Sequence, residues 1–147
     1  MPTLESLFSG VSPQCTLGGD ATGQDAVLDL ALAAQGMRRE CWEALLWRYL
    51  RDDMARSSLY RRLVNKSRKA RSRLVQERAG PLARLVLAEE HSQLETLYAS
   101  EAEHILLTCS RREWRDTLRP AFLQLRGALD LWARAGAAHI RRRLADG

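Results

Sequence analysis

The sequence is poor in several residue types, and each shortage argues against a class of protein. Only three cysteines occur among the 147 residues; they lie far apart, and none belongs to a CxxC pair. A disulfide framework and a cysteine-based zinc finger are therefore poorly supported. No apolar run reaches the roughly 18 residues needed to cross a bilayer, and the N-terminus has neither the basic start nor the apolar stretch of a signal peptide. We expect a cytoplasmic protein with no membrane partner.

Common catalytic and phosphate-binding motifs are also missing. No G-x-S-x-G, H-E-x-x-H, P-loop or G-x-G-x-x-G pattern occurs, and the three histidines are scattered. His104 and Cys109 lack the two further ligands nearby that a zinc site needs. We therefore predict that the chain is not an enzyme and holds no metal or cofactor.

Lysine is almost absent, although the chain is basic. Of 23 lysine and arginine residues, all but Lys66 and Lys69 are arginine, and the net charge is +5. The planar guanidinium suits bidentate contact with phosphates and base edges. Residues 56–78 hold nine basic residues and one acid, residues 82–107 hold one and five, and residues 108–147 hold nine and four. The net charge thus conceals two basic blocks with an acidic stretch between them.

Residues 1–23 differ in kind from the rest of the chain. Twelve of them are Gly, Pro, Ser or Thr, and only two are charged. Such a composition does not sustain a helix, so we expect a flexible N-terminal arm. Leu7, Phe8 and Val11 are more apolar than a solvated linker requires. Whether the arm docks on its own body, docks on a partner or stays disordered is left open.

Residues 24–147 form the predicted body, which is all-α. Apolar residues recur there with helical period, and no alternating strand of useful length occurs. Gly36 stands where a left-handed residue would end the first helix. Before the last third of the chain, helices are predicted over 25–35, 38–51, 58–78 and 81–91.

Two of the predicted helices carry a clear apolar stripe, which indicates that they pack in a core. The helix over 38–51 has its stripe at Trp42, Leu45, Leu46, Tyr49 and Leu50, with charged side chains mostly elsewhere. A C-terminal packing helix over 120–145 has its stripe at Phe122, Leu125, Leu129, Trp132, Ile140 and Leu144.

The most informative stretch is Ser100 to Pro120, SEAEHILLTCSRREWRDTLRP. A short helix over about 101–107 and a tight turn precede Ser110, which begins an S-x-x-E capping box with Glu113. Trp114 and Leu118 are predicted to face inward. Pro120 disfavours a continued helix and permits a new one to begin. The arginines of this second short helix face outward: Arg111, Arg112, Arg115 and Arg119.

Two short helices joined by a tight turn are the arrangement of a helix-turn-helix, which we predict at about residues 100–119. In that motif the second helix presents the side chains of its N-terminal end to base edges in the major groove. The arginine fork can pair with O6 and N7 of guanine. The predicted DNA contacts are Ser110, Arg111, Arg112, Arg115 and Arg119. An ordinary helix hairpin with a solvated arginine face is the alternative.

The other basic block covers residues 61–73 and is too densely charged for an ordinary helix face. It could cover a phosphate backbone, nascent RNA or an acidic surface of a protein partner such as RNA polymerase. A solvated basic face is the alternative, and the absence of aromatics within the block argues against base stacking. Its candidate contact residues are Arg61, Arg62, Lys66, Arg68, Lys69, Arg71 and Arg73.

The C-terminal third, CSRREWRDTLRPAFLQLRGALDLW, resembles the helix-turn-helix of phage-type transcription regulators, in which an S-R-x-x-W start is followed by a further helix. With its length, arm and arginine-rich middle, the chain resembles the Q-type processive antiterminators of lambdoid phages and the AlpA-like regulators of pseudomonads. The motif match covers roughly 35 residues, and the rest is similarity of layout. Some members carry a cysteine-cluster zinc site, which this sequence lacks.

The resemblance implies a specific role. Members bind a DNA element near a promoter, engage a paused bacterial RNA polymerase, with sigma factor as a further contact, and travel with it through terminators. It places Ser110, Arg111, Arg112 and Arg115 at the DNA. We add the hypothesis that the arm, through Leu7, Phe8 and Val11, enters the RNA exit channel. The alternatives are a simple repressor or activator, a phage small-terminase-like DNA binder and a helical adaptor that binds no DNA.

Overall fold

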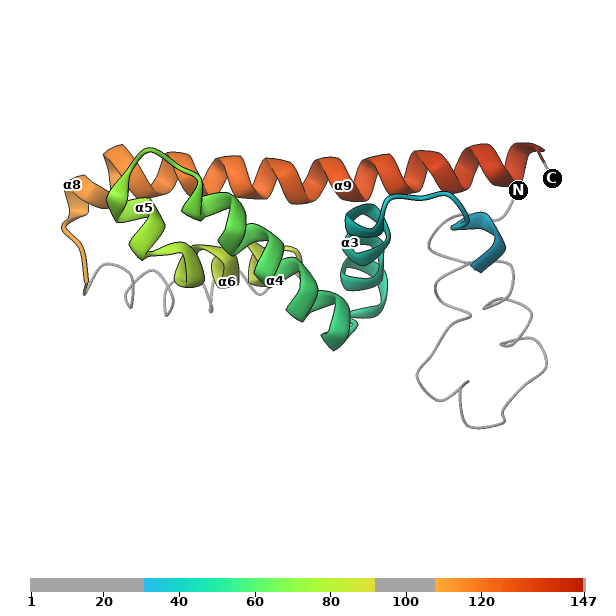
Figure 1. Cartoon of the computed structure of the whole chain (residues 1–147), viewed down its shortest axis with the longest axis horizontal. Helices are drawn as coiled ribbons and strands as arrows, with labels where there is room; N and C mark the ends of the chain where they lie inside the picture. Colours follow the sequence, from blue (N-terminus) through green and yellow to red (C-terminus); the bar gives the residue numbers. More distant parts are fainter. Residues whose placement is uncertain (1–30, 92–107, 147) are drawn as a thin grey trace. The chain divides into compact units, whose positions relative to one another are not determined.

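The computed structural model describes residues 31–91 and 108–146, and every regular element within them is a helix (Figure 1). The prediction of an all-α body is therefore confirmed for the described residues. The N-terminal arm, with Leu7, Phe8 and Val11, lies outside them. So does the first predicted helix of the helix-turn-helix, over 101–107.

The helices follow the chain with short connections. Two predicted ranges agree with the structure to within about two residues: α3 stands for the range 38–51 and α6 for the range 81–91. The elements are α3 (Arg39–Leu50), α4 (Asp53–Arg68), α5 (Arg73–Glu77), α6 (Ala79–Glu89), α8 (Arg111–Glu113), the π-helical segment η2 (Trp114–Leu118) and α9 (Arg119–Asp146).

The single helix predicted over 58–78 was wrong, because two helices occupy this region. α4 begins earlier, at Asp53, where the Asp52 carboxylate accepts from the Ala55 amide at 2.9 Å. The chain then leaves the helix at residues 69–72, and Ser72 caps α5 by accepting from the Val75 amide at 3.4 Å. No glycine or proline marks this break. A helix continued through it would have placed Lys69 and Arg73 four residues apart on one face.

The interruption expected at Pro120 was also wrong. α8, η2 and α9 follow one another without a gap from Arg111 to Asp146. In η2 the Arg119 amide donates to the Trp114 carbonyl, five residues back, which is the π-helical pattern. This wider turn lies directly before Pro120 and changes the hydrogen-bond register where proline has no N–H to donate. The helix therefore passes through the proline.

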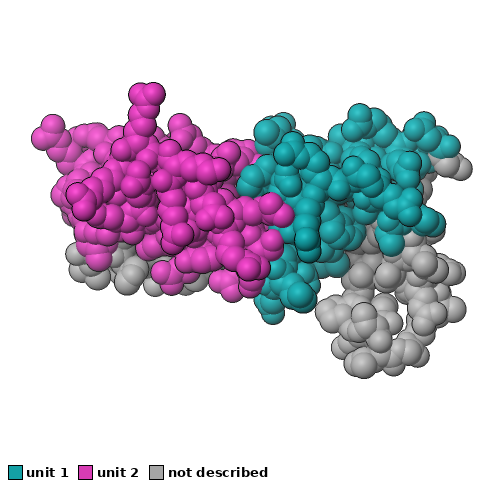
Figure 2. All heavy atoms as spheres, viewed as in Figure 1, with its two compact units in different colours: residues 1–55, 131–147 teal, residues 56–130 magenta. Residues whose placement is uncertain are grey.

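The chain divides into two compact units (Figure 2). Unit 1 comprises residues 1–55 and 131–147, and unit 2 comprises residues 56–130. α4 and α9 each contribute residues to both units.

Unit 1 is built on the predicted apolar stripe of α3. Leu45 and Ile140 are completely buried and share a core with Ala33 and Ala137. The remaining stripe residues of α3 and Leu144 of α9 pack around this core and are half-buried. The period-3.6 pattern of both helices therefore identified the packed faces.

Other residues of α3 are buried beyond the predicted stripe. Cys41, Ala44 and Trp47 are buried, and so is Glu43, although charged side chains were expected mostly outside the apolar stripe. The Glu43 carboxylate lies 3.7 Å from Arg39 Nε. The prediction was wrong for Glu43 because the apolar stripe marks only one buried face of α3. In the structure a second face of α3, which includes Glu43, is buried as well.

Glycine has a defined role at two positions of unit 1. Gly36 has φ +80°, as predicted for a left-handed helix stop, and the preceding Gln35 carbonyl lies 2.9 Å from His139 Nε2. At Gly136, a Cβ would lie 2.9 Å from Leu45 Cδ1 and 3.0 Å from the Cys41 carbonyl oxygen. The absence of a side chain at Gly136 thus lets α9 approach α3 closely.

Unit 2 has its own core, which α4, α5, α6, η2 and the first part of α9 supply. Leu59, Leu63, Leu82 and Leu118 are completely buried within it. Arg126 of α9 donates to the Glu89 carboxylate of α6 at 2.7 Å. Further buried residues of this unit are Val64, Val75, Leu85, Val86, Leu87, Phe122, Leu125 and Leu129.

None of the helices within the described part of the chain is both long enough and apolar enough to span a membrane.

Candidate nucleic-acid interface

Ser110 sets the start of the arginine-rich helix, as the sequence predicts. Its side-chain oxygen accepts from the Glu113 amide at 3.0 Å, and its own amide donates to Glu113 Oε1 at 2.8 Å. Both halves of the capping box are thus present. The hydrogen bonds from the Ser110 backbone and side chain lower the pKa of the Glu113 carboxyl. This local network fixes Arg111 as the first residue of the helix.

The four arginines in and after this box are all exposed, so the predicted outward direction is confirmed for Arg111, Arg112, Arg115 and Arg119. Arg111, Arg115 and Arg119 are spaced by four residues. A π-turn rotates less per residue than an α-turn, so η2 keeps Arg119 closer to the line of the other two than an uninterrupted α-helix would. The π-turn therefore brings Arg111, Arg115 and Arg119 near one line along the helix.

Asp116 divides the four exposed arginines into two kinds. Its carboxylate lies 3.6 Å from Arg112 Nε and 3.0 Å from Arg115 Nε. Arg111 and Arg119 form no ion pair with any residue of the described ranges. Arg111 and Arg119 thus present the charge that is not offset locally, while Asp116 holds the other two side chains.

The inward face differs in part from the prediction. Leu118 is completely buried, as expected. Trp114 is only half-buried, and its ring lies 6.4 Å from that of Phe122 at an angle of 41°. The prediction of a buried Trp114 was therefore too strong. The indole covers the edge of the core, and Leu118 is the true anchor of η2.

The basic block over residues 61–73 lies at the same end of unit 2 as the arginines from Arg111 to Arg119. α5 packs against η2, although more than thirty residues separate them in the sequence (Figure 1). Arg73, the first residue of α5, is 92% exposed at its side chain and lies 3.3 Å from Glu77. We name this surface the basic end. It comprises Lys66, Arg68, Lys69, Arg71 and Arg73 together with Arg111, Arg112, Arg115 and Arg119, all of them exposed.

The block over 61–73 is not one helical face. Arg61 is exposed on α4, and Arg62 is half-buried on the same helix. The residues from Lys69 to Ser72 form the break between α4 and α5, where the Gln76 side chain donates to the Ala70 carbonyl at 2.6 Å. The densest positive charge therefore lies at the C-terminal end of α4 and in the turn over residues 69–72, which ends where Ser72 caps α5.

Arg78 links the α5–α6 junction to the chain just before the capping box, and sequence reasoning did not identify it. It lies between α5 and α6, and its guanidinium donates to the Thr108 carbonyl at 2.8 Å, just before the capping box. Arg78 Nε is buried and finds no hydrogen-bond partner among the described residues. Its signal in the sequence was weak, because an arginine in a basic block is not distinguishable there from its neighbours.

Neither a metal centre nor a relative gives a further indication of function. The described ranges contain no group of three His, Cys, Asp or Glu side chains that could hold a metal ion. Comparison with protein-family models, with curated protein sequences and with solved structures finds no match. A functional interpretation therefore depends on the geometry of the basic end and on the motif over residues 109–132.

Proposed function

We propose that this protein is a DNA-binding transcription antitermination factor that contacts duplex DNA through its basic end. The observation that carries the proposal is the packing of α5 against η2, which joins two distant basic blocks beside a capped helix start. Nine exposed basic residues then serve one surface. Backbone contacts from such a surface supply affinity for any duplex, and a few correctly placed side chains supply sequence preference.

The two groups of basic residues have different roles in this proposal. The arginines that begin the long helix read base edges in the major groove, because a guanidinium fork matches O6 and N7 of guanine. Arg111 and Arg119 contact the bases directly. Arg115 first breaks its ion pair with Asp116 and then contacts a base. The residues from Lys66 to Arg73 hold the phosphates alongside, since a turn and a helix end can track a DNA backbone.

The helix-turn-helix belongs to the proposal in a modified form. The reading helix enters the groove with its first turns and continues as α9, rather than ending at Arg119. A recognition helix needs only its N-terminal end at the bases, so a long continuation is compatible with that docking. The first helix of the motif corresponds to residues 101–107, outside the described residues.

The antitermination role derives from the resemblance of residues 109–132 to the Q-type regulators. In this role the protein binds DNA near a promoter in the bacterial cytoplasm, joins RNA polymerase and promotes read-through of terminators. A simple repressor would use the same basic end. The two functions differ in the step after DNA binding, so they require separate experiments.

DNA binding is tested by comparing two arginine pairs on one helix. The Arg111→Ala, Arg115→Ala variant should bind a duplex selected from a random pool about 5- to 150-fold more weakly per lost base contact, with a much smaller loss on random DNA. The control is Arg141→Ala, Arg142→Ala, which removes two exposed charges elsewhere and should change neither affinity. Equal losses on both duplexes would refute base reading.

The phosphate contacts predict a different signature. Changing Arg68, Lys69 and Arg71 to Ala should weaken binding uniformly across sequences and reduce the slope of log affinity against log salt by about one per lost contact. An unchanged slope would remove these residues from the interface.

Antitermination is tested in a purified transcription assay. On a template that carries the selected element upstream of a terminator, the full chain should increase read-through. The Arg111→Ala, Arg115→Ala variant should not. Reduced initiation without increased read-through would identify a repressor instead.

A further inference from the structure

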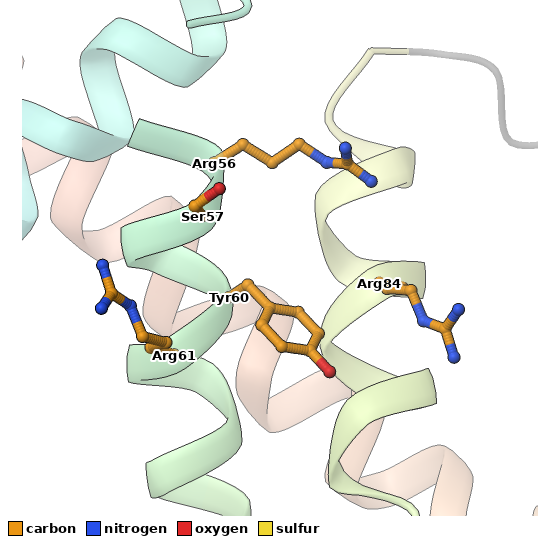
Figure 3. A pocket seen from close by; sticks show the side chains of 5 residues that line it. All are labelled: Arg56, Ser57, Tyr60, Arg61 and Arg84. Atoms are coloured by element: carbon orange, nitrogen blue, oxygen red, sulfur yellow. The ribbon is translucent and has the colours of Figure 1, made fainter. Parts of the chain in front are cut away.

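Unit 2 contains a pocket that is separate from the residues of the basic end. It lies between α4 and α6 and has a volume of about 370 Å³ (Figure 3). Its lining consists of Arg56, Ser57, Tyr60, Arg61 and Arg84. Only Arg61 belongs to the basic block that the sequence singled out.

The sequence builds this pocket by helical spacing. Arg56 and Tyr60 are four residues apart on α4, as are Ser57 and Arg61, so the two pairs form two neighbouring rows along the helix. Leu59 and Leu63 of the same helix are completely buried and anchor it in the core. Arg84 is exposed on α6, between the buried Ala83 and Leu85.

Gly80 leaves room for the side chain of Tyr60, which forms the aromatic wall of the pocket. A Cβ at Gly80 would lie 2.9 Å from the Tyr60 hydroxyl oxygen, which is closer than real side chains approach. The hydroxyl therefore occupies the space that a side chain on α6 would fill. In Figure 3 the ring spans from α4 towards α6. Tyr60 is half-buried, so part of it remains available to a ligand.

The lining selects for an anion. It contains three guanidinium groups and no carboxylate. Within the described part of the chain, neither Arg61 nor Arg84 takes part in an ion pair or hydrogen bond. Guanidinium groups pair with phosphate oxygens in bidentate, charge-assisted hydrogen bonds. A ligand with two negative charges would therefore neutralise Arg61 and Arg84.

The size of the pocket and the tyrosine ring indicate an organic group beside the phosphate. Pockets that bury small organic ligands have volumes of about 300–1,000 Å³, and a bare phosphate leaves most of such a space empty. Nucleobases stack on aromatic side chains and on guanidinium planes. We propose that this pocket binds a nucleoside polyphosphate, with its base against Tyr60 and its phosphates on the arginines.

The arginines reach the ligand by changing rotamer. In Figure 3 the Arg56 side chain extends towards α6, whereas the tips of Arg61 and Arg84 point away from the space between the helices. Exposed side chains change rotamer readily, and such changes are common on binding. Arg61 and Arg84 therefore close over the ligand from α4 and α6.

The test is isothermal titration of the full chain with ATP and GTP. Replacing both Arg61 and Arg84 by Ala should weaken binding about 100-fold, since each hydrogen-bonded charge contact contributes about tenfold or more. The control is Arg141→Ala, Arg142→Ala, which removes two exposed guanidinium groups that neither line the pocket nor belong to the basic end. Its affinity should be unchanged. Absence of saturable binding by the unaltered chain, or equal loss in both variants, would overturn the proposal.

Two further arms separate the base from the phosphates. Tyr60→Leu should weaken ATP binding about tenfold but leave inorganic tripolyphosphate unaffected, while Tyr60→Phe should retain most of the ATP affinity. Equal affinity for ATP and tripolyphosphate would overturn the role of the ring. The Arg61→Ala, Arg84→Ala variant should still prefer the selected duplex, so failure of this proposal and failure of DNA binding are distinguishable.

Discussion

The two ends of the helix from Arg111 to Asp146 both carry arginine clusters, but their surroundings differ. At the first end a capping box fixes the helix start, a π-turn aligns the side chains, and α5 packs alongside with a second basic block. At the other end, residues 141–143 are exposed beside a core that includes Ile140, and Arg143 lies 3.5 Å from Gln35. Similar arginine content therefore does not imply a similar function, because the neighbouring elements decide what a cluster can contact.

The largest expected loss of stability comes from replacing one buried side chain near each end of the helix. Leu118 of η2 and Ile140 of α9 are both completely buried. Replacing either by Ala should lower the free energy of unfolding by about 2–5 kcal/mol in urea titrations. Below the unfolding transition, only Leu118→Ala should weaken DNA binding, because it removes the support of the arginine row. Equal DNA affinity in the two variants would show that η2 does not position the interface.

A smaller effect is expected where the two helices of unit 1 meet. Gly136→Ala should destabilise the protein by about 1–3 kcal/mol, since the new methyl group meets the Cys41 carbonyl oxygen, which cannot rotate away as the Leu45 side chain can. Thermal and urea unfolding measure the loss. The DNA affinity of the folded variant should be unaffected, and an unchanged midpoint would mean that α3 and α9 separate at little cost.

Loss of the capping box at the start of the helix should also lower the stability of the protein. Ser110→Ala should cost about 1 kcal/mol, because the Glu113 amide loses its acceptor. The lowered pKa of Glu113 means that its contribution is present at neutral pH and disappears as the pH falls through that pKa. The stability difference between Glu113→Gln and the unaltered chain should therefore shrink in acid. A difference that persists unchanged at low pH would remove Glu113 from the capping network.

The sequence predicted local features of this molecule better than its assembly. Helix type, the Ser110 box, the Gly36 stop and the stripe centred on Leu45 depend on residues within a few positions of one another, and the structure confirms them. The packing of α5 on η2, the role of Arg78 and the pocket at Arg84 depend on residues distant in the sequence. Periodicity carries no information about such contacts.

Two of the wrong predictions have the same origin. Pro120 and the block over 61–73 were interpreted by propensity alone, which favoured a break at the first and a continuous helix in the second. A π-turn at η2 accommodates the proline, and repulsion among close basic residues disfavours helix where no breaker is present. The local features that accompany these outcomes are the hydrogen-bond register of η2 and the Ser72 cap of α5.

The smallest predicted effect is a gain of stability, at Gly127 of α9. Gly127 is exposed within the helix, and a Cβ there would meet nothing within 4 Å. Gly127→Ala should therefore stabilise the protein by about 0.5–1 kcal/mol, because alanine restricts the unfolded chain and favours helix. Gly136→Ala, the same substitution further along the helix, should have the opposite sign. Paired urea titrations would test both, and a loss at Gly127 would indicate that this exposed face contacts a partner or a second copy.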